Sequence, residues 1–306
     1  MKFIVFSDLH IHNYKKFDKD GSRLRNCIKV LEDIFEKAYQ KKIPYILFAG
    51  DLFDQQKSLP ISVINETVRA FKRLSELYPD ISFIAISGNH DHGSKNTSEK
   101  SAETSLEFLD LMLDNFHLID RGYFDLSEDY RVWGIPYYSH AEHYKNMVSS
   151  IDPSEALNNY LLIHQTPLHS NSMIPHDCSP NDSRDFDFTF CGHIHKYERL
   201  SEKFCIVGSP LHRDLGDEGQ DKGFLIFDTI KNDYERVILD FPKIVRTNDE
   251  TTDYAIPIVH TMPETADNHT SLDLNSSPES LLKEYLAIVE KDDYFTTGKT
   301  LLHEKL

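Results

Sequence analysis

The stretch that decides the fold runs from Ile81 to Gly93 and reads ISFIAISGNHDHG. Its first half is a run of apolar and β-branched residues, which is typical of a buried strand. Its second half places an amide, two imidazoles and a carboxylate at the end of that strand. One such cluster is explained by turn chemistry, because turns favour Asn, Asp and Gly. The same arrangement recurs at four other strand ends, and turn chemistry alone does not predict that recurrence.

Strands and helices alternate along the first half of the chain. KFIVFS (2–7) and IPYILFAG (43–50) indicate two further strands. Apolar residues at steps of three and four predict an amphipathic helix after each of these strands, through Leu24, Ile28, Leu31, Phe35 and Ala38, and through Ile61, Ile64, Val68, Phe71 and Leu74. A third helix is expected over 105–115. This alternation predicts an α/β fold whose sheet has a parallel half covered by helices.

The second half of the chain is richer in strands. Short apolar segments joined by polar turns indicate antiparallel additions, in the order YFDL, YRVWGIP, YLLIHQ, FDFTFCGH, FCIVGSP, GFLIFD and YERVILDF. Two sheets packed face to face, with helices outside, are the simplest way to bury so many strands.

The bulk composition bounds the class of protein. With 306 residues, of which 40% are hydrophobic, the chain is long enough to bury a large core. The N-terminus MKFIVFSDLH lacks the features of a signal peptide, and no apolar run approaches the ~20 residues of a membrane span. We therefore expect a cytoplasmic protein with no membrane partner. The four scattered cysteines predict neither a disulfide framework nor a thiolate zinc site.

Polar side chains collect at the ends of five expected strands. They are Asp8 and His10, Asp51 and Asp54, Asn89 and His90, His164, and finally His193 and His195. The carboxyl ends of strands in open α/β sheets line the crevice where ligands bind. Carboxylate, imidazole and amide ligands suit manganese, iron or zinc. The set is large enough for two ions that share one carboxylate, an arrangement that suits phosphoryl hydrolysis.

Five segments together resemble the signature motifs of the calcineurin-like metallophosphoesterases: DLH (8–10), GDLFD (50–54), GNHD (88–91), HQ (164–165) and GHIH (192–195). The resemblance implies a four-layer αββα sandwich, that is, two mixed sheets flanked by helices, with a dinuclear metal site at one edge. It assigns one metal to Asp8, His10, Asp51 and His195, and the other to Asp51, Asn89, His164 and His193.

The same resemblance gives roles to the remaining polar residues. It implies that His90 is the proton donor or transition-state stabiliser and that Asp54 orients it. Asp91 is expected to order the turn. His12 and His92 are expected to lie behind the ligands or on the surface.

Two segments point to one branch of this superfamily. GSPLHRDLGDEGQDKGFLIFD (208–228) resembles the Gly-Ser-Pro … Lys-Gly segment of SbcD-type DNA-repair nucleases, and WGIPYYS (133–139) is similar to a segment of tailed-phage recombination endonuclease small subunits. Serine/threonine phosphatases have Arg-Gly where this chain has Gln55 and Gln56. The resemblance implies a DNA exonuclease or endonuclease that uses two divalent ions, Mn²⁺ first and Fe or Zn as alternatives, to activate water.

The resemblance also implies partners. Such nucleases act with an SbcC-type coiled-coil ABC ATPase, and a net charge of −17 favours a partner that supplies DNA affinity. We expect a nuclease domain over 1–245, a polar linker or reduced cap over 246–277, and a C-terminal amphipathic helix within 278–306 that docks on the ATPase or packs on its own domain. A homodimer contact and core packing both explain the apolar positions Leu106, Leu109, Met112 and Leu113.

Two other functions fit the same motifs. A phosphodiesterase or phosphatase acting on nucleotides or small phosphoesters needs the same five motifs. A non-catalytic scaffold of this fold is disfavoured, because such proteins lose metal ligands and every expected ligand is present here. Cleavage polarity, strand preference, exonuclease or endonuclease action and oligomeric state are left open by the sequence.

Overall fold

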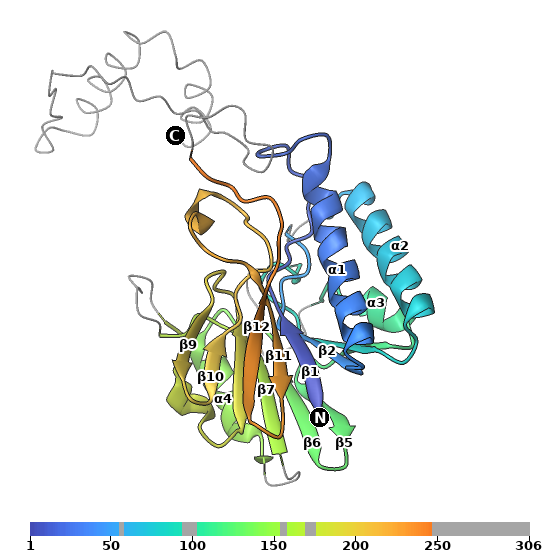
Figure 1. Ribbon diagram of the computed structural model, residues 1–306. Coiled ribbons are helices and arrows are strands. Elements are labelled where there is room, and N and C mark those ends of the chain that lie inside the picture. Colours follow the sequence, from blue (N-terminus) through green and yellow to red (C-terminus); the bar gives the residue numbers. More distant parts are fainter. Residues whose placement is uncertain (55–57, 94–102, 154–157, 169–175, 247–306) are drawn as a thin grey trace, which may run out of the picture. The chain divides into compact units, whose positions relative to one another are not determined.

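The computed structural model describes residues 1–54, 58–93, 103–153, 158–168 and 176–246 (Figure 1). Their strands form two mixed sheets of six strands each. The first sheet has the order β12 (Asp233–Ile238), β11 (Gly223–Asp228), β1 (Lys2–Phe6), β2 (Tyr45–Phe48), β3 (Ser82–Ala85) and β4 (Phe116–Leu118). The second has the order β5 (Gly122–Ser127), β6 (Tyr130–Ile135), β7 (Asn158–His164), β8 (Phe188–Gly192), β10 (Phe204–Ile206) and β9 (Glu198–Ser201).

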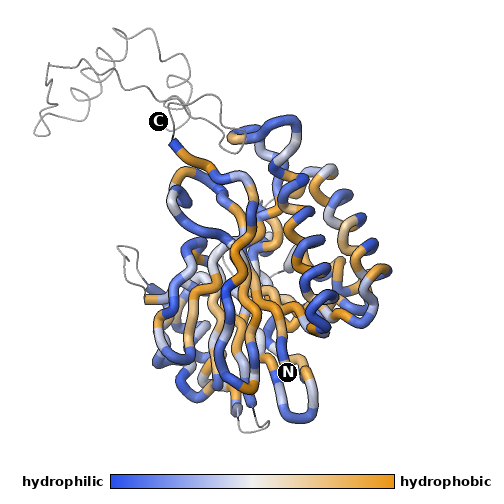
Figure 2. Tube along the Cα trace, viewed as in Figure 1, coloured by the Kyte–Doolittle hydropathy of each residue, from blue (hydrophilic) through white to orange (hydrophobic). Residues whose placement is uncertain are grey.

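Side-chain alternation along β1 explains how the first sheet is buried on both faces. Phe3 and Val5 point toward the second sheet, whereas Ile4 and Phe6 point toward the helices. The helices on that outer face are α1 (Ser22–Gln40), α2 (Ile61–Leu77) and α3 (Glu107–Met112). Figure 2 shows the result as strands that are hydrophobic along most of their length and helices with one apolar stripe.

A third apolar cluster covers the outer face of the second sheet. Leu161 and Ile163 of β7 pack there against Tyr144 and Val148 of α4 (Ala141–Ser150). The layers are therefore helices, sheet, sheet and helix, which confirms the predicted αββα sandwich.

The expectation of antiparallel additions in the second half was wrong for the middle of the second sheet. The neighbours β6, β7, β8 and β10 are parallel, and only the outer strands β5 and β9 are antiparallel to theirs. Parallel neighbours need crossover connections, and α4 supplies the one between β6 and β7. This helix was not predicted, because it buries only two apolar side chains, Tyr144 and Val148.

Other expectations have mixed outcomes. The third helix is shorter than expected, and Leu106 and Leu109 are buried in the core, whereas Met112 is 57% exposed. All four cysteines are buried and free. None of the helices in the described ranges combines the length and apolar character needed to cross a membrane. The linker expected over 246–277 begins at Arg246 but otherwise lies, like the helix expected within 278–306, outside the described residues.

Candidate metal centre

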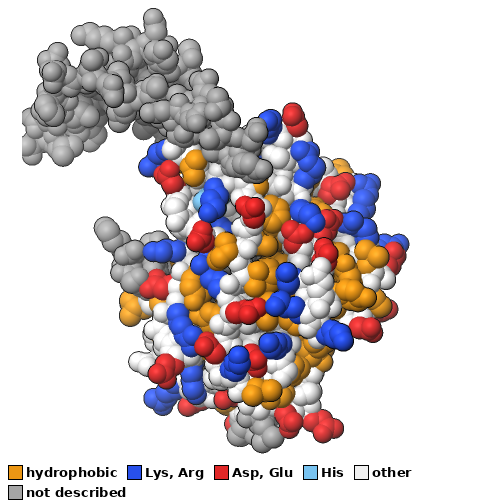
Figure 3. Space-filling model, viewed as in Figure 1, with side chains coloured by type: hydrophobic (Ala, Val, Ile, Leu, Met, Phe, Trp, Pro, Cys, Tyr) orange, Lys and Arg blue, Asp and Glu red, His pale blue; other side chains and the backbone are white. Residues whose placement is uncertain are grey.

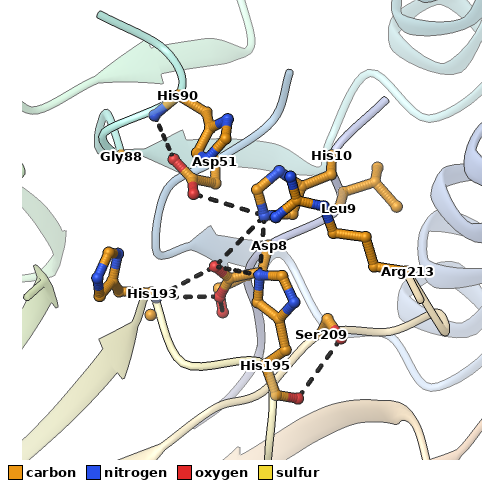
Figure 4. Close-up of polar contacts among 12 residues, drawn as sticks. Asp8, Leu9, His10, Asp51, Gly88, His90, His193, His195, Ser209 and Arg213 are labelled. Carbon is orange, nitrogen blue, oxygen red and sulfur yellow. Dashed lines mark hydrogen bonds and ion pairs between the residues drawn. The ribbon is translucent and has the colours of Figure 1, made fainter. Parts of the chain in front are cut away.

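Side chains that follow β1, β2, β3 and β8 lie close together (Figure 4), and His164 at the end of β7 is grouped with Asp51 and His193. Hydrogen bonds between the two sheets hold them there. His164 at the end of β7 approaches the carbonyl oxygen of Ala49, just after β2, with Nδ1 at 2.7 Å. The backbone N–H of His193, just after β8, donates to both carboxylate oxygens of Asp8 at 3.1 Å. Residues far apart in the sequence therefore share one site.

Asp8, His10 and His195 form the first ligand cluster. The Nε2 atoms of His10 and His195 lie 3.0 Å apart, and each lies 3.8 Å from Oδ1 of Asp8. These two ring nitrogens and the carboxylate offer nitrogen and oxygen donors within the reach of a single ion. Donors and spacing therefore fit a bound metal ion.

Asp51, His164, His193 and Asn89 form the second cluster. Oδ1 of Asn89 lies 3.2 Å from Nε2 of His164 and 2.8 Å from Nδ1 of His193. Oδ2 of Asp51 lies 3.3 Å from Nε2 of His164 and 3.5 Å from Nε2 of His10, which belongs to the first cluster. Asp51 thus stands between the two clusters, in the place that a shared carboxylate requires.

The backbone at this edge is strained. Asp8, His10, Asp51 and His193 all have positive φ, at 55°, 48°, 62° and 82°. Such conformations cost ~1–3 kcal/mol each outside glycine and persist only where the surroundings enforce them. Part of that enforcement is close packing, because a Cβ on Gly88 would lie 2.1 Å from Oδ1 of Asp51.

The Nδ1 atoms of His10 and His164, which face away from the clusters, each lie close to an oxygen atom. Nδ1 of His10 lies 3.2 Å from Oδ1 of Asp54, and Nδ1 of His164 lies 2.7 Å from the Ala49 carbonyl oxygen. The Ala49 carbonyl oxygen accepts from Nδ1 of His164 and so directs Nε2 of that ring at the site, and the Asp54 carboxylate lies beside Nδ1 of His10. Metal-binding histidines are oriented by such partners.

Burial controls the charge of these groups. It lowers the pKa of His193 to about 3 and that of His195 to about 4, so both rings are neutral at pH 7. Burial alone would lower the pKa of His164, but the charges of Asp51 and Asp8 raise it to about 10. His164 thus carries a proton beside two carboxylates. A divalent cation would replace that proton when it binds.

Comparison with known proteins matches residues 1–197 to the calcineurin-like phosphoesterase family. The chain belongs to that family. The DNA double-strand break repair protein Mre11 of Archaeoglobus fulgidus is 28% identical over 114 residues, which make up 37% of this chain but only 24% of that protein. TT1561 of Thermus thermophilus is similar in fold, with a TM-score of 0.50 at 12% identity over 78% of this chain and 98% of that one.

His90 and Asp54 of this phosphoesterase contact each other differently from the expected arrangement. Nδ1 of His90 lies 2.5 Å from the backbone carbonyl oxygen of Asp54, not from its carboxylate. The carboxylate instead contacts His10 and forms an ion pair with the Arg213 guanidinium, with an N···O distance of 2.8 Å. Burial would raise the pKa of Asp54, but His10, Tyr14 and Arg213 hold it well below its usual range.

Asp91 orders the turn around the second cluster. Its carboxylate accepts from the backbone N–H groups of Asp51, Leu52, Phe53 and Gly88. His12 and His92 are both buried rather than exposed. Nδ1 of His12 lies 2.5 Å from the carbonyl oxygen of His10, and Arg23 contacts its Nε2.

Sequence reasoning missed two residues that support His195. The His195 carbonyl oxygen accepts from the backbone N–H of Ser209 at 3.0 Å and from Nζ of Lys222 at 2.8 Å. Lys222 is 4% exposed and also pairs with Asp217 at 2.6 Å. Both residues lie in the 208–228 segment, so its resemblance to nucleases was the signal that could have identified them.

Tyr137 was missed as well. Its ring stacks on His193 with a centroid distance of 5.6 Å, and its backbone N–H donates to the Ser87 carbonyl oxygen at 3.1 Å. It lies in the 133–139 segment, which was noted only for its resemblance to phage endonucleases.

Proposed function

We propose that this phosphoesterase is a metal-dependent DNA phosphodiester hydrolase, the exonuclease or endonuclease subunit of an SbcCD-like repair or recombination complex. The observation that carries the proposal is the position of Asp51 between two ligand clusters, because a shared carboxylate serves two-metal phosphoryl hydrolysis. The similarity to an Mre11 repair protein supports DNA as the substrate. The resemblance of the 133–139 and 208–228 segments to nucleases supports the same branch.

The metal ligands in this proposal are Asp8, His10, Asp51 and His195 for one ion, and Asp51, Asn89, His164 and His193 for the other. Mn²⁺ is the first candidate, because the ligand atoms are nitrogen and oxygen. Two such ions would lower the pKa of a bound water and place positive charge beside the phosphoryl oxygens. Asp54 holds the His10 ring at Nδ1, so that Nε2 stays directed at Asp8 and Asp51.

His90 is the proposed proton donor. Its Nδ1–H is committed to the Asp54 carbonyl oxygen, which fixes the ring and leaves Nε2 as the proton-transferring atom. When protonated, the ring donates from Nε2 to the leaving sugar oxygen and offsets charge on the phosphoryl group. The His90 backbone N–H donates to Oδ1 of Asp51 at 2.8 Å, so the donor and the shared ligand are held together.

The proposal includes partners. Basic and acidic side chains are interspersed over the face shown in Figure 3, and the chain carries a net charge of −17. We therefore propose that an SbcC-type ATPase supplies most of the DNA affinity, docked on the helix expected within 278–306 after a linker over 246–277. Of the four positions expected at a homodimer contact, Leu106 and Leu109 are buried, so the proposed contact is limited to Met112, which is 57% exposed, and Leu113.

The experiment that tests this function is a gel assay of end-labelled duplex and single-stranded DNA with Mn²⁺. We expect metal-dependent cleavage by the wild type, and loss of at least ~10²-fold in His90→Ala, the scale of a lost general acid. The matched control is His140→Ala, because His140 is an exposed histidine outside the clusters.

Cleavage of a small aryl phosphodiester is measured in parallel. If the wild type hydrolyses that compound through His90 but leaves DNA intact, even with the ATPase present, the function is a nucleotide or small-phosphoester phosphodiesterase. If neither substrate is hydrolysed and no metal is retained, the chain is a non-catalytic scaffold.

A further inference from the structure

A cavity of about 720 Å³ lies between the first halves of α1 and α2, outside both ligand clusters. Its volume is within the ~300–1,000 Å³ of typical ligand pockets. Its lining includes three basic and three acidic side chains, Lys15, Arg25, Lys29, Asp18, Glu32 and Glu66. Asn13, Leu24, Asn26 and Ile28 add amide and apolar groups. Figure 1 shows α1 and α2 side by side over the first sheet, so this cavity follows the groove between them.

The cavity begins close to the metal centre. Asn13 lines it and is three residues after His10, so the chain between them spans at most ~10 Å. Nδ2 of Asn13 donates to Oγ of Ser62 at 3.0 Å, which ties this loop to the start of α2. A chain of nucleotides with one phosphate at the ligand clusters therefore reaches the cavity with a neighbouring nucleotide.

The end of the cavity near Asn13 is cationic. The segment 13–25 holds five basic and two acidic side chains, in a chain of net charge −17. Of the three acidic residues lining the cavity, Asp18 accepts from the backbone N–H groups of Gly21 and Arg23. The other two are in ion pairs, Glu66 with Arg69 and Glu32 with Lys29 and Arg73. Lys15 and Arg25 form no ion pair within the described ranges. Arg25 donates one N–H to the Asp20 carbonyl oxygen and keeps its other donors, so Lys15 and Arg25 are the basic groups that a ligand can contact.

The floor of the same cavity is apolar. Leu24 and Ile28 lie one turn apart on α1 and are partly buried, and the amide of Asn26 lies between them in sequence. Positive charge beside a small apolar floor and an amide matches a nucleotide, which has a phosphate, a flat ring system and hydrogen-bonding edges. Backbone-tracking cations and base contacts are the usual elements of single-strand binding.

We infer that this cavity binds a nucleotide of a single-stranded substrate that flanks the scissile phosphodiester, with Lys15 and Arg25 on its phosphate and Leu24 and Ile28 under its base. The inference rests on the proposed nuclease function, whose substrate it specifies. Lys15, Arg25 and the apolar floor would then determine the preference for a polynucleotide over a small phosphodiester.

The test uses the full chain with Mn²⁺ and compares Lys15→Ala/Arg25→Ala with Lys72→Ala/Lys203→Ala. The control pair removes the same charge from exposed lysines outside the cavity. We expect the cavity variant to raise KM for a single-stranded 12-mer by about tenfold, the effect of two exposed charge contacts. The slope of log KM against log salt should fall by about 0.7, the value for one lost phosphate contact. Turnover of a small aryl phosphodiester should stay unchanged.

A third variant, Asn26→Trp, fills the cavity without changing charge. It should raise KM for the 12-mer and leave turnover of the small phosphodiester unchanged. If the cavity variant matches the control pair in KM and salt slope, the cavity is not a substrate site and the inference is overturned, while DNA cleavage by the wild type would still support the nuclease.

Binding of a fluorescent 12-mer in Ca²⁺ distinguishes failure of the nucleotide-site inference from failure of the nuclease proposal. Binding that needs Lys15 and Arg25, without cleavage in Mn²⁺, would refute the nuclease and retain the nucleotide site. A wild type that neither binds nor cleaves the 12-mer, even with the ATPase present, refutes both.

Discussion

The substitution Gly88→Ala tests whether the position of Asp51 governs the metal centre. A Cβ at residue 88 would lie 2.1 Å from Oδ1 of Asp51, 2.5 Å from its backbone N and 2.7 Å from its Cγ. Because nonbonded heavy atoms rest ~3.5 Å apart, the carboxylate or the turn must move by about 1 Å. That movement also disturbs the bond from His90 N–H to Oδ1 of Asp51.

The expected losses follow from that displacement. Overpacking of this kind costs ~1–3 kcal/mol, which lowers Tm by about 5 °C in a domain of this size. A misplacement of 1 Å costs ~10²-fold in catalysis, so phosphodiester turnover should fall by about that factor. One of the two metal ions should also bind more weakly, because Asp51 contacts both ligand clusters.

The control is Gly93→Ala, in the same motif. A Cβ at Gly93 would meet no atom within 4 Å, so this variant carries the same chemical change without the collision. Metal content by mass spectrometry, Tm by circular dichroism and turnover of an aryl phosphodiester are measured for both variants. If Gly88→Ala equals Gly93→Ala in metal content and turnover, the reasoning about Asp51 is refuted.

Three further predictions concern stability. Lys222→Met leaves the buried Asp217 carboxylate without its ion-pair partner. It should lower the free energy of unfolding by ~3–5 kcal/mol in urea titrations, because an unpaired buried charge is strongly unfavourable. Adding Asp217→Asn should restore part of that stability, and no recovery in the double variant would contradict the ion-pair explanation. Burial raises the pKa of Asp120 to about 6, so the folded state holds this proton more tightly than the unfolded chain does. From pH 4 to pH 7 the wild type should therefore lose on the order of 2 kcal/mol of stability relative to Asp120→Asn, and parallel pH profiles would contradict this. Removing metal with a chelator should lower Tm by about 5–10 °C, and adding Mn²⁺ should restore it. A ligand at 100 times its Kd raises the free energy of unfolding by ~2.7 kcal/mol. An unchanged Tm would argue against bound metal.

The parts of the fold that sequence analysis predicted well depend on local pattern. Apolar strands followed by Asp, His or Asn identify the edge of the sheet where ligands meet, because each motif carries both its strand and its side chain. Topology in the second half depends instead on connections. The parallel pairing of β6 with β7 depends on the short crossover helix α4. Only two of its apolar side chains are buried, and that periodicity is too weak to predict a helix.

In the candidate site, too, features that depend on local sequence could be predicted and features that depend on distant segments could not. The ligand clusters were predicted because every member lies within a motif. The contacts of Asp54 could not be read from GDLFD, since whether its carboxylate meets His90, His10 or Arg213 depends on a loop that enters from 160 residues away. Lys222 looks like a surface lysine in DKGFLIFD, and only the packed structure buries it against the His195 carbonyl oxygen.

The strain at the ligands and the binding of a cation have one physical origin. Two buried carboxylates, Asp8 and Asp51, and four left-handed backbone positions would relax apart if the chain around them were free to move. Asp91 prevents this with four backbone hydrogen bonds, and Gly88 lets the backbone approach Asp51. The folded domain therefore holds negative charge and imidazole lone pairs in place before a metal ion arrives. Binding then needs little rearrangement of the ligands, and the unfavourable charge density itself becomes the source of affinity for a divalent cation.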